Sequence, residues 1–416
     1  MSLSASLLAI HAQTDSKERA TQYRALLSSL LASAPDLHPG RSTLHPPQHP
    51  QPLAESIHEI LTHAVAEQTG LVTSRQMLQD FVTLFAEAAA NAGERDTVVA
   101  AVRKAWEAAL AVMQPRAVAF EEQISTVREH LASLYESAEE WDEAAKMLQG
   151  IPLDSGHRSV APSYKLRIYI HIVRLLLESD DAVGAEAYLN RAALLVDAST
   201  PAEQIIHFKS CQARILDQKR SFLLAAGKYL ELSYTSEIHE SVRTQLLGQA
   251  VTCAVLAGAG PQRSRMLATL YKDDRLRDTP DLAPANDILQ KMYLGRVLRP
   301  QHVAHFAPTL APHQLARLAD GSTVLDRAVT QHNLLAASNI YTNISFAQLA
   351  TLLAISVPTA EKTAARMIAD GNLAGEIDQM ETVIHFRKTK RSEAWDNSVA
   401  GLCHHVDGVV DTLAKK

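Results

Sequence analysis

Cysteine and aromatic residues are both scarce in this sequence. Its three cysteines, Cys211, Cys253 and Cys403, lie far apart among 416 residues and form no CxxC pair. A disulfide framework or a thiolate metal site is therefore not expected, and we interpret all three as reduced thiols in a core. Aromatic residues make up only 5% of the chain. Together with abundant alanine and leucine, this scarcity favours closely packed helices over a large aromatic core.

Long apolar runs and an excess of positive charge are missing as well. Even the alanine-rich segment 98–112 is interrupted by Arg103, Lys104 and Glu107, so it falls short of the roughly 20 apolar residues that span a bilayer. The N-terminus lacks the basic start and apolar stretch of a secretion signal. The formal net charge of −6 gives no electrostatic footprint for a polyanion. We expect a cytoplasmic and nuclear protein that binds neither membrane nor nucleic acid.

Sequence signatures of catalysis are also missing. The segment from His58 to His63 resembles a zinc-protease HExxH motif, but its histidines are five residues apart and diverge by roughly 140° around a helix. His302 and His305 lack an acidic companion at ligand spacing. No glycine-rich phosphate loop and no GxSxG elbow occurs. We therefore expect no catalytic residue, metal or cofactor, although a triad assembled from distant residues stays open.

Prolines are concentrated in residues 35–52, where six of them remove amide donors and forbid helix continuation. This segment is interpreted as a loop that follows an N-terminal helical segment, residues 1–34. Its three histidines are not expected to bind metal, since no cysteine or carboxylate cluster accompanies them.

Beyond the Pro-rich loop, one apolar pattern recurs. Ala144, Ala185 and Ala225 are separated by 41 and 40 residues, and each lies between apolar residues spaced three or four positions away. The spacing fits one helix pair per repeat, because a small residue lets the second helix of a pair pack closely on the first. Chance similarity of three amphipathic helices is the alternative. We predict a TPR-like helical-repeat solenoid over residues 53–310, with hairpin tips at residues 139–140, 180–181 and 219–220.

The pattern changes over residues 311–391. Helices are expected at residues 322–340, at 346–353 after a Ser345 cap, and from Pro358 to a closing Gly371. Residues 375–386 then alternate apolar and polar side chains around a turn, which indicates a β-hairpin. Three helices and a hairpin predict a winged helix. Its third helix could enter a DNA groove, but its charges balance, so a winged-helix nucleic-acid-binding protein is the less favoured alternative.

The tail, residues 392–416, places apolar residues at alternating spacings of four and three. Such a heptad stripe is typical of helices that bundle, and we favour bundling with partner helices over folding back. The predicted partner-binding residues are Trp395, Val399, Leu402, Val406, Val409 and Leu413.

Helical repeats that lead into a winged helix are the layout of the PCI-domain family, found in the proteasome lid, the COP-nine signalosome and a translation initiation factor. Several stretches also resemble, in order, the subunit 4 family of the COP-nine signalosome. They are Gln114–Gln123 with Arg128–Ser133, Ala185–Ala192, Gln262–Asp273, and Ala319–Ser322 with Leu325–Val329 and His332–Leu335. The Pro-rich segment departs from that family, which leaves the geometry of the N-terminal arm near it open.

The resemblance implies a non-catalytic scaffold subunit of the complex that removes Nedd8 from cullins in cullin-RING ubiquitin ligases. In that family the zinc isopeptidase centre lies in another subunit. Other signalosome subunits would bind the winged helix and the C-terminal helix, and the N-terminal arm would contact the cullin-RING substrate. A proteasome-lid PCI subunit has the same fold and is the first alternative.

Overall fold

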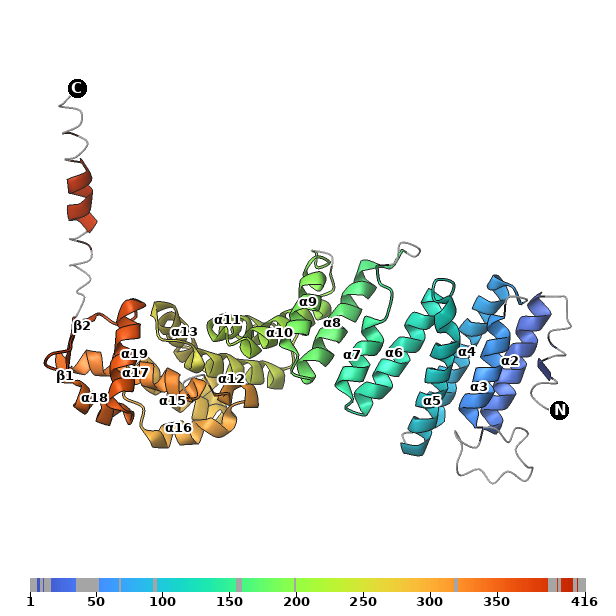
Figure 1. Ribbon diagram of the computed structural model, residues 1–416, viewed down its shortest axis with the longest axis horizontal. Coiled ribbons are helices and arrows are strands. Elements are labelled where there is room, and N and C mark those ends of the chain that lie inside the picture. The colour runs from blue at the N-terminus through green and yellow to red at the C-terminus, as the bar shows by residue number, and fades with distance from the viewer. Residues whose placement is uncertain are drawn as a thin grey trace. The chain divides into compact units, whose positions relative to one another are not determined.

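A computed structural model describes residues 6, 7, 10, 16–34, 52–66, 69–92, 96–154, 159–197, 200–317, 321–387, 395, 398–406 and 410. These residues are mainly helical, and a single small sheet lies near the C-terminal end of the described chain (Figure 1). The expected mainly helical fold class is confirmed. The chain divides into two compact units, Met1–Cys211 and Gln212–Lys416. The Pro-rich loop falls outside the described residues except for Pro52.

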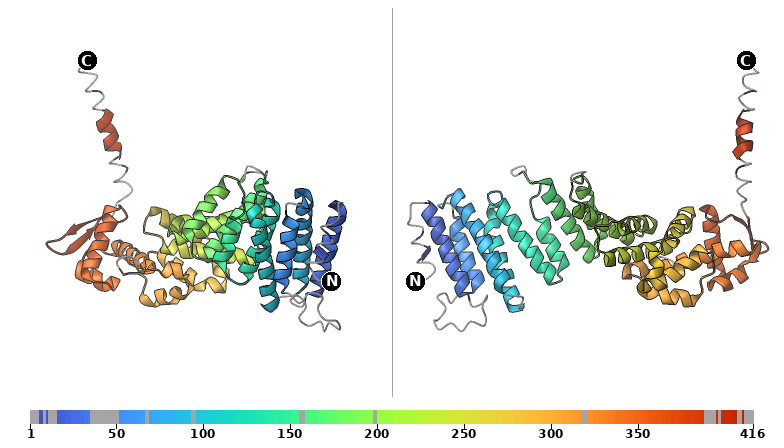
Figure 2. Two further views of the ribbon diagram at one scale, coloured as in Figure 1. Left: turned by 45° about the vertical axis from the view of Figure 1, so that its right-hand side comes forward. Right: turned by 180° about the vertical axis from the view of Figure 1, so that it is seen from behind.

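The first unit is a row of helices packed side by side (Figure 2). Helix α6 packs on α7, α7 on α8, and α8 on α9, while α3 packs on α5 and α2 on α4. Its elements are α2 (Ser16–Ser33), α3 (Leu53–Val65), α4 (Leu71–Ala92), α5 (Asp96–Met113), η2 (Gln114–Arg116), α6 (Glu121–Ser137), α7 (Trp141–Gln149), α8 (Pro162–Glu178), α9 (Ala182–Ala193) and the start of α10 (Ala202–Gln218).

The predicted hairpin tips share one backbone geometry. Glu139, Asp180 and Arg220 are all left-handed, with φ of 59°, 61° and 60°. The next amide in each case bonds to the carbonyl five residues earlier: Glu140 to Tyr135 and Asp181 to Leu176 at 2.9 Å, and Ser221 to Leu216 at 2.8 Å. This is the hydrogen bond of a Schellman-type helix end. Because the turn residues repeat at the same 41 and 40 spacing as the alanines, three unrelated helices do not explain the pattern.

The repeated alanines are fully buried in their helices. Ala144, Ala185 and Ala225 are each 0% exposed, within α7, α9 and α11 (Phe222–Ser233) respectively. A residue without side-chain atoms beyond Cβ lets two helix backbones approach, and protein interiors leave little spare volume at such contacts.

Replacing one of these alanines with leucine is predicted to overpack the contact. Ala185→Leu should lower the free energy of unfolding by about 1–3 kcal/mol, because leucine cannot fit without shifting its neighbours. Urea denaturation followed by far-UV circular dichroism measures the effect. Ala187→Leu, an exposed site on the same helix, is the control and should change stability by less than about 0.5 kcal/mol. Equal effects at both sites would contradict the close-contact explanation.

The second unit continues with helices and ends in the sheet. Two clusters of buried apolar residues form its core, one around α11, α12, α13 and α15 and the other around α17, α18, α19 and the sheet. Besides α11 and the end of α10, its elements are α12 (Glu240–Leu256), α13 (Pro261–Tyr271), α14 (Arg275–Asp278), η3 (Pro280–Leu282), α15 (Ala283–Tyr293), α16 (Pro300–Phe306), η4 (Ala307–Thr309), η5 (Pro312–Leu315), α17 (Val324–Ile340), β1 (Asn343–Ser345), α18 (Phe346–Leu353), α19 (Val357–Ala369), β2 (Gly375–Asp378) and β3 (Val383–Phe386).

The helices expected after the repeats are present with the expected caps. The Ser345 side chain accepts a hydrogen bond from the Gln348 amide at 3.4 Å, at the start of α18. Pro358 lies in the first turn of α19, where its missing amide is not needed. Gly371 follows α19 with a φ of 70°, a conformation that glycine adopts without steric cost.

The expected hairpin is present but belongs to a three-stranded sheet. Strands β2 and β3 pair antiparallel, and β1 pairs with the other edge of β3, giving the order β1-β3-β2. Ile384 of β3 lies opposite both Ile344 and Ile377. The sequence did not predict β1, because three residues between two helices carry no alternating pattern.

The turn after α18 offers a matched pair of substitutions. Ala354 is exposed and left-handed, with a φ of 55° that disfavours any residue with a Cβ. Ala354→Gly should therefore raise the free energy of unfolding by about 0.5–1 kcal/mol. The same change at Ala365, exposed within α19, should lower it by about 1 kcal/mol, because glycine is a poor helix former. Thermal unfolding compares them, and shifts of the same sign would refute the assigned turn conformation.

Candidate partner-binding site

The predicted partner-binding stripe lies on an uncovered helix. Residues 395, 398–406 and 410 are helical and exposed throughout. Trp395 is 70% exposed and Leu402 is 67% exposed, with Val399 at 42% and Val406 at 54%. The other two members of the stripe, at positions 409 and 413, fall outside the described residues. No part of the described chain covers this apolar face.

Two further residues of the tail were not assigned correctly from the sequence. Val410 is 56% exposed and adds to the apolar surface, although the heptad spacing did not include it. Cys403 is exposed, so its interpretation as a core thiol was wrong, whereas Cys211 and Cys253 are buried as expected. The reason is that nothing described packs on the tail helix, and therefore none of its faces becomes interior.

The buried Cys253 lies close to an acid. Its thiol hydrogen-bonds the Asp217 carboxylate, and burial, followed by that negative charge, raises the pKa of the thiol far above its usual value. The Asp217 carboxylate also accepts two hydrogen bonds from the Gln314 amide, at 2.9 and 3.1 Å, and lies 3.1 Å from His313 Nε2. A thiol held protonated is a poor nucleophile. The cluster therefore connects α10 to η5 as a structural tie.

The histidine arrangements considered from the sequence do not converge on a metal. His58 is exposed, while Nδ1 of His63 lies 2.6 Å from the Tyr23 hydroxyl on α2, so the two rings diverge as expected. His302, however, does have an acidic neighbour: Asp287 of α15 lies 3.7 Å away, and it also pairs with Lys291. Among the described residues, no group of three or more His, Cys, Asp or Glu side chains is placed to hold a metal ion.

Helix α17 carries the polar contacts that fix the winged helix to the preceding helices. Asn333 is buried, accepting from the Leu298 amide at 2.7 Å and donating to its carbonyl at 3.0 Å. Gln331, two positions earlier in α17, accepts from the Ala259 amide at 3.2 Å. Both backbone segments lie in loops, so side chains of α17 supply the partners that no helix or strand provides.

A buried arginine and a buried histidine lie in the same region. Arg263 donates to the Ala254 and Val255 carbonyls at 3.3 and 3.2 Å, at the C-terminal end of α12, where a cation is favoured. Burial lowers the pKa of Arg263 to about 10. The pKa of His332 is lowered to about 4, mainly by burial and also by the charge of Arg263, against the hydrogen bond to the Arg296 carbonyl, which raises it. The neutral imidazole therefore donates through Nε2 to the Arg296 carbonyl, 2.9 Å away.

Because His332 resists protonation in the fold, stability should depend on pH. An unfolded histidine has a pKa near 6.5, so the unfolded chain takes up this proton first. The contribution of neutral His332 to the free energy of unfolding is complete above pH ~6.5. It should be lost as the pH falls towards about 4, and the free energy should fall by at most about 1.4 kcal/mol per pH unit.

The pH dependence is measured by urea denaturation of the wild type and of His332→Gln, whose amide retains a donor. Carboxylates titrate in both proteins, so the difference between the two stability curves isolates His332. A difference that stays constant between pH 7 and pH 4 would contradict the assignment.

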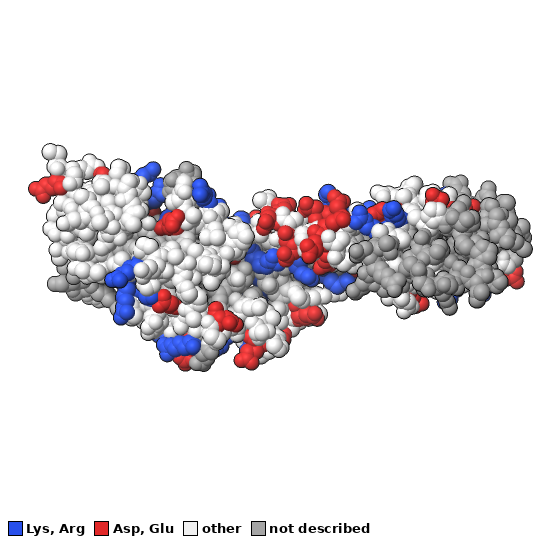
Figure 3. All heavy atoms as spheres, turned by 90° about the horizontal axis from the view of Figure 1, so that it is seen from below, with Lys and Arg blue, Asp and Glu red and all other residues white. Residues whose placement is uncertain are grey.

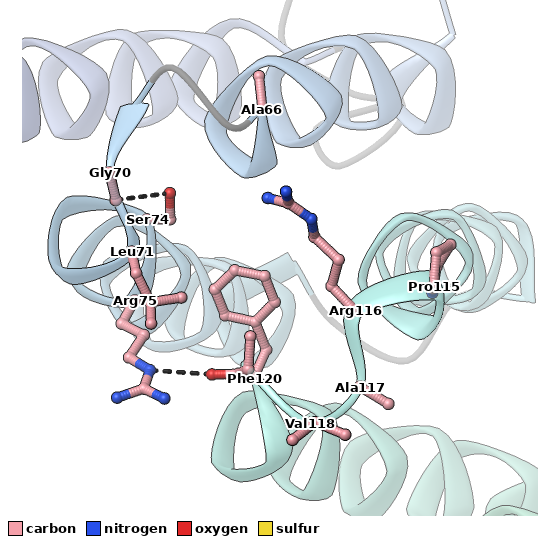
Figure 4. Close-up of a pocket in the computed structure, with 11 residues that line it drawn as sticks. Ala66, Gly70, Leu71, Ser74, Arg75, Pro115, Arg116, Ala117, Val118 and Phe120 are labelled. Atoms are coloured by element: carbon pink, nitrogen blue, oxygen red, sulfur yellow. Dashed lines mark hydrogen bonds between the residues drawn. The ribbon is translucent and has the colours of Figure 1, made fainter.

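A groove opens in the first unit, between the α3–α4 turn and the α5–α6 connection (Figure 4). Its volume is about 620 Å³. Arg116 donates to the Val65 carbonyl at 2.7 Å, at the end of α3, and Arg75 donates through Nε to the Ala119 carbonyl at 2.9 Å. The side chain of Phe120 points into the space between them (Figure 4). We call this the arm groove.

Apolar side chains are exposed around the arm groove. Leu71 and Val118 line it and are 49% and 65% exposed, and the neighbouring Val72 is 82% exposed. Scattered exposed apolar residues are ordinary, but several around one groove mark a surface suited to a protein partner.

Acidic side chains gather at the α6–α7 and α8–α9 turns, on the face of the molecule seen in Figure 3. A cavity of about 420 Å³ there is lined by Glu139, Glu140, Asp142, Glu143 and neighbours. Arg103 pairs with Glu140 at 3.0 Å and neutralises part of the charge. The remaining carboxylates give these turns a negative potential that would repel acidic partners.

Comparison with known proteins identifies the family. Residues 48–241 match the family described as PSMD12/CSN4, N-terminal, and residues 309–388 match the PCI domain. COP9 signalosome complex subunit 4 of Arabidopsis thaliana is 44% identical over 410 residues, covering 97% of this chain and 96% of that protein. The chain belongs to the COP9 signalosome complex subunit 4 family.

Other relatives with the same name agree along nearly the whole chain. The protein of Emericella nidulans is 38% identical, covering 98% of this chain and 97% of its own length, and that of Drosophila melanogaster is 38% identical, covering 96% and 91%. The resemblance to the subunit 4 family of the signalosome is thus confirmed. Among the described residues, no helix is long and apolar enough to cross a bilayer.

Proposed function

We propose that this chain is a non-catalytic scaffold subunit of a COP9 signalosome. In this role it supports removal of Nedd8 from cullins, and so regulates cullin-RING ubiquitin ligases, while the metallo-isopeptidase centre lies in another subunit. The single observation that carries the proposal is the 38–44% identity to proteins named as subunit 4 over 96–98% of the chain. The buried Cys253, held protonated beside a carboxylate, is consistent with a structural role.

The tail is proposed to bind the other signalosome subunits, together with the winged helix. An apolar stripe on a helix that no described residue covers is stabilised once partner helices bury it. The residues proposed for this contact are Trp395, Val399, Leu402, Val406, Val409 and Leu413.

Charges placed in the stripe should abolish assembly. Leu402→Asp with Val409→Asp would bury carboxylates in a helical bundle, whereas the repeats, which do not contain these positions, should stay folded. Co-purification with the other subunits measures assembly, and circular dichroism measures folding.

A matched control introduces the same number of charges on the opposite face of the tail helix. Ala400→Asp with His404→Asp lies about half a helical turn away from the stripe and should still assemble. Normal recovery of the complex with the stripe variant would contradict the bundle role.

The N-terminal arm is proposed to contact the cullin-RING ligase, and the arm groove supports this with exposed apolar residues. Val72→Asp with Val118→Asp should leave assembly intact but weaken binding of the assembled complex to a cullin-RING ligase. Val183→Asp with Leu194→Asp changes two equally exposed apolar residues outside the groove and is the control. Unchanged ligase binding by the groove variant would remove this contact from the proposal.

The proteasome-lid alternative is tested by identifying the proteins that co-purify with this chain. Affinity purification from its own cells, followed by mass spectrometry, should recover signalosome subunits and cullins. Recovery of proteasome base subunits instead would favour the lid. We propose both cytoplasm and nucleus as its location, which fractionation of the same cells checks.

A further inference from the structure

A cavity of about 600 Å³ lies between α17 and α19 of the winged helix. Its lining is rich in cations and hydroxyl groups: Arg327 comes from α17, and Lys362, Arg366, Thr359 and Thr363 come from α19. None of the tail residues proposed for assembly lines this cavity. We call it the basic groove.

The structure separates charges that balance in the sequence. Residues 359, 362, 363 and 366 are spaced three, one and three apart, so they share one face of α19. Glu361 is not part of the groove lining and its carboxylate accepts a hydrogen bond from Gln379 in the wing at 3.3 Å. Asp370 follows the end of α19 and also lies outside the groove lining. The cations of α19 therefore line the groove, whereas the acidic residues Glu361 and Asp370 do not.

The described surroundings do not neutralise the groove cations. Among the described residues, no carboxylate forms an ion pair with Arg327, Lys362 or Arg366. Asp326 is the one acid in the lining, and its carboxylate already accepts from the Thr323 amide at 3.0 Å and from the Thr323 hydroxyl at 2.7 Å. Three positive charges against one negative leave a net charge of +2 in the lining, close to the N-terminus of α17, whose dipole adds positive potential.

We propose that the basic groove binds an acidic peptide segment of a partner protein. Carboxylate side chains would pair with the arginines and the lysine, and threonine hydroxyls would donate to the same oxygens. Ile355 and the alkyl chains of the cations give the groove an apolar side that suits a peptide.

A nucleic acid fits this surface less well than a peptide. A duplex continues beyond any one cavity, and specific binders usually neutralise several phosphates along it. The neighbouring wing would place Glu376, Asp378 and Glu381 near such a backbone, and their charge would repel phosphates. A short acidic segment can pair with the groove cations without continuing along the surface as a duplex does.

Fluorescence anisotropy of the full-length protein tests the proposal. The probe is a short fluorescein-labelled peptide in which aspartate and glutamate flank a leucine, measured at low and at physiological salt. Binding should weaken roughly tenfold or more in Arg327→Ala/Lys362→Ala/Arg366→Ala, because the ion pairs are removed together. The control Arg265→Ala/Lys272→Ala/Arg299→Ala removes three cations outside the groove and should bind as the wild type does.

A charge reversal makes the test independent of overall stability. In Arg327→Glu/Lys362→Glu/Arg366→Glu, a lysine-rich peptide of the same length should bind better than the acidic one, and thermal unfolding confirms that the variant is folded. Equal binding of the acidic peptide by the alanine variant and the wild type would overturn the proposal. Tighter, groove-dependent binding of a labelled DNA duplex than of the peptide would overturn it as well. None of these results depends on assembly, so the scaffold proposal is tested separately.

Discussion

The close contact of helices at small residues is the constraint on which the repeat fold depends. An isolated helix pair exposes its apolar face, and only the next pair can cover it. Ala144, Ala185 and Ala225 sit fully buried at these contacts, and the left-handed residue at each hairpin tip sets where the second helix begins. The turn and the buried alanine therefore recur together in each of the three helix pairs.

In the second unit, the last part of the fold is held by polar contacts and not by another repeat with buried apolar contacts. Asn333 and Gln331 of α17 hydrogen-bond the backbone of two loops, and Arg263 bonds the last carbonyls of α12. Buried polar groups are costly unless they are satisfied, so such a set favours one arrangement of loops over its competitors. The winged helix is therefore fixed to the helices before it by directional bonds, which suits a domain that must present its surfaces at defined positions.

Much of this fold could be predicted from the sequence because its signals are local. The Ser345 cap, Pro358 in a first turn and Gly371 after a helix each depend on residues a few positions away, and all were placed correctly. The hairpin was predicted for the same reason. The strand β1 was not, because three residues acquire a strand conformation only through pairing with β3, which lies some forty positions later in the chain.

What the sequence could not supply was the neighbourhood of each side chain. Asp287 lies beside His302 although helix spacing did not pair them, and Cys403 is exposed although its residue type favours burial. The spacing of the α19 cations puts them on one helix face, but only the structure shows that this face and Arg327 of α17 line the same groove. For the candidate site, the apolar spacing of the tail could be predicted from the sequence, whereas the exposure of its side chains could be seen only in the structure.

The surfaces proposed for binding differ from the buried polar groups in the partners that they already have. The buried polar groups described here bond to the chain's own backbone or to one another, as Arg263 and Asn333 do, and so they have little capacity left for a ligand. The apolar stripe on the tail and the cations of the basic groove, in contrast, are accessible to a partner. Apolar area gains most from being buried, whereas charges guide encounter and orientation. Under the two proposals, the stripe would therefore supply the strength of assembly and the groove the choice of partner.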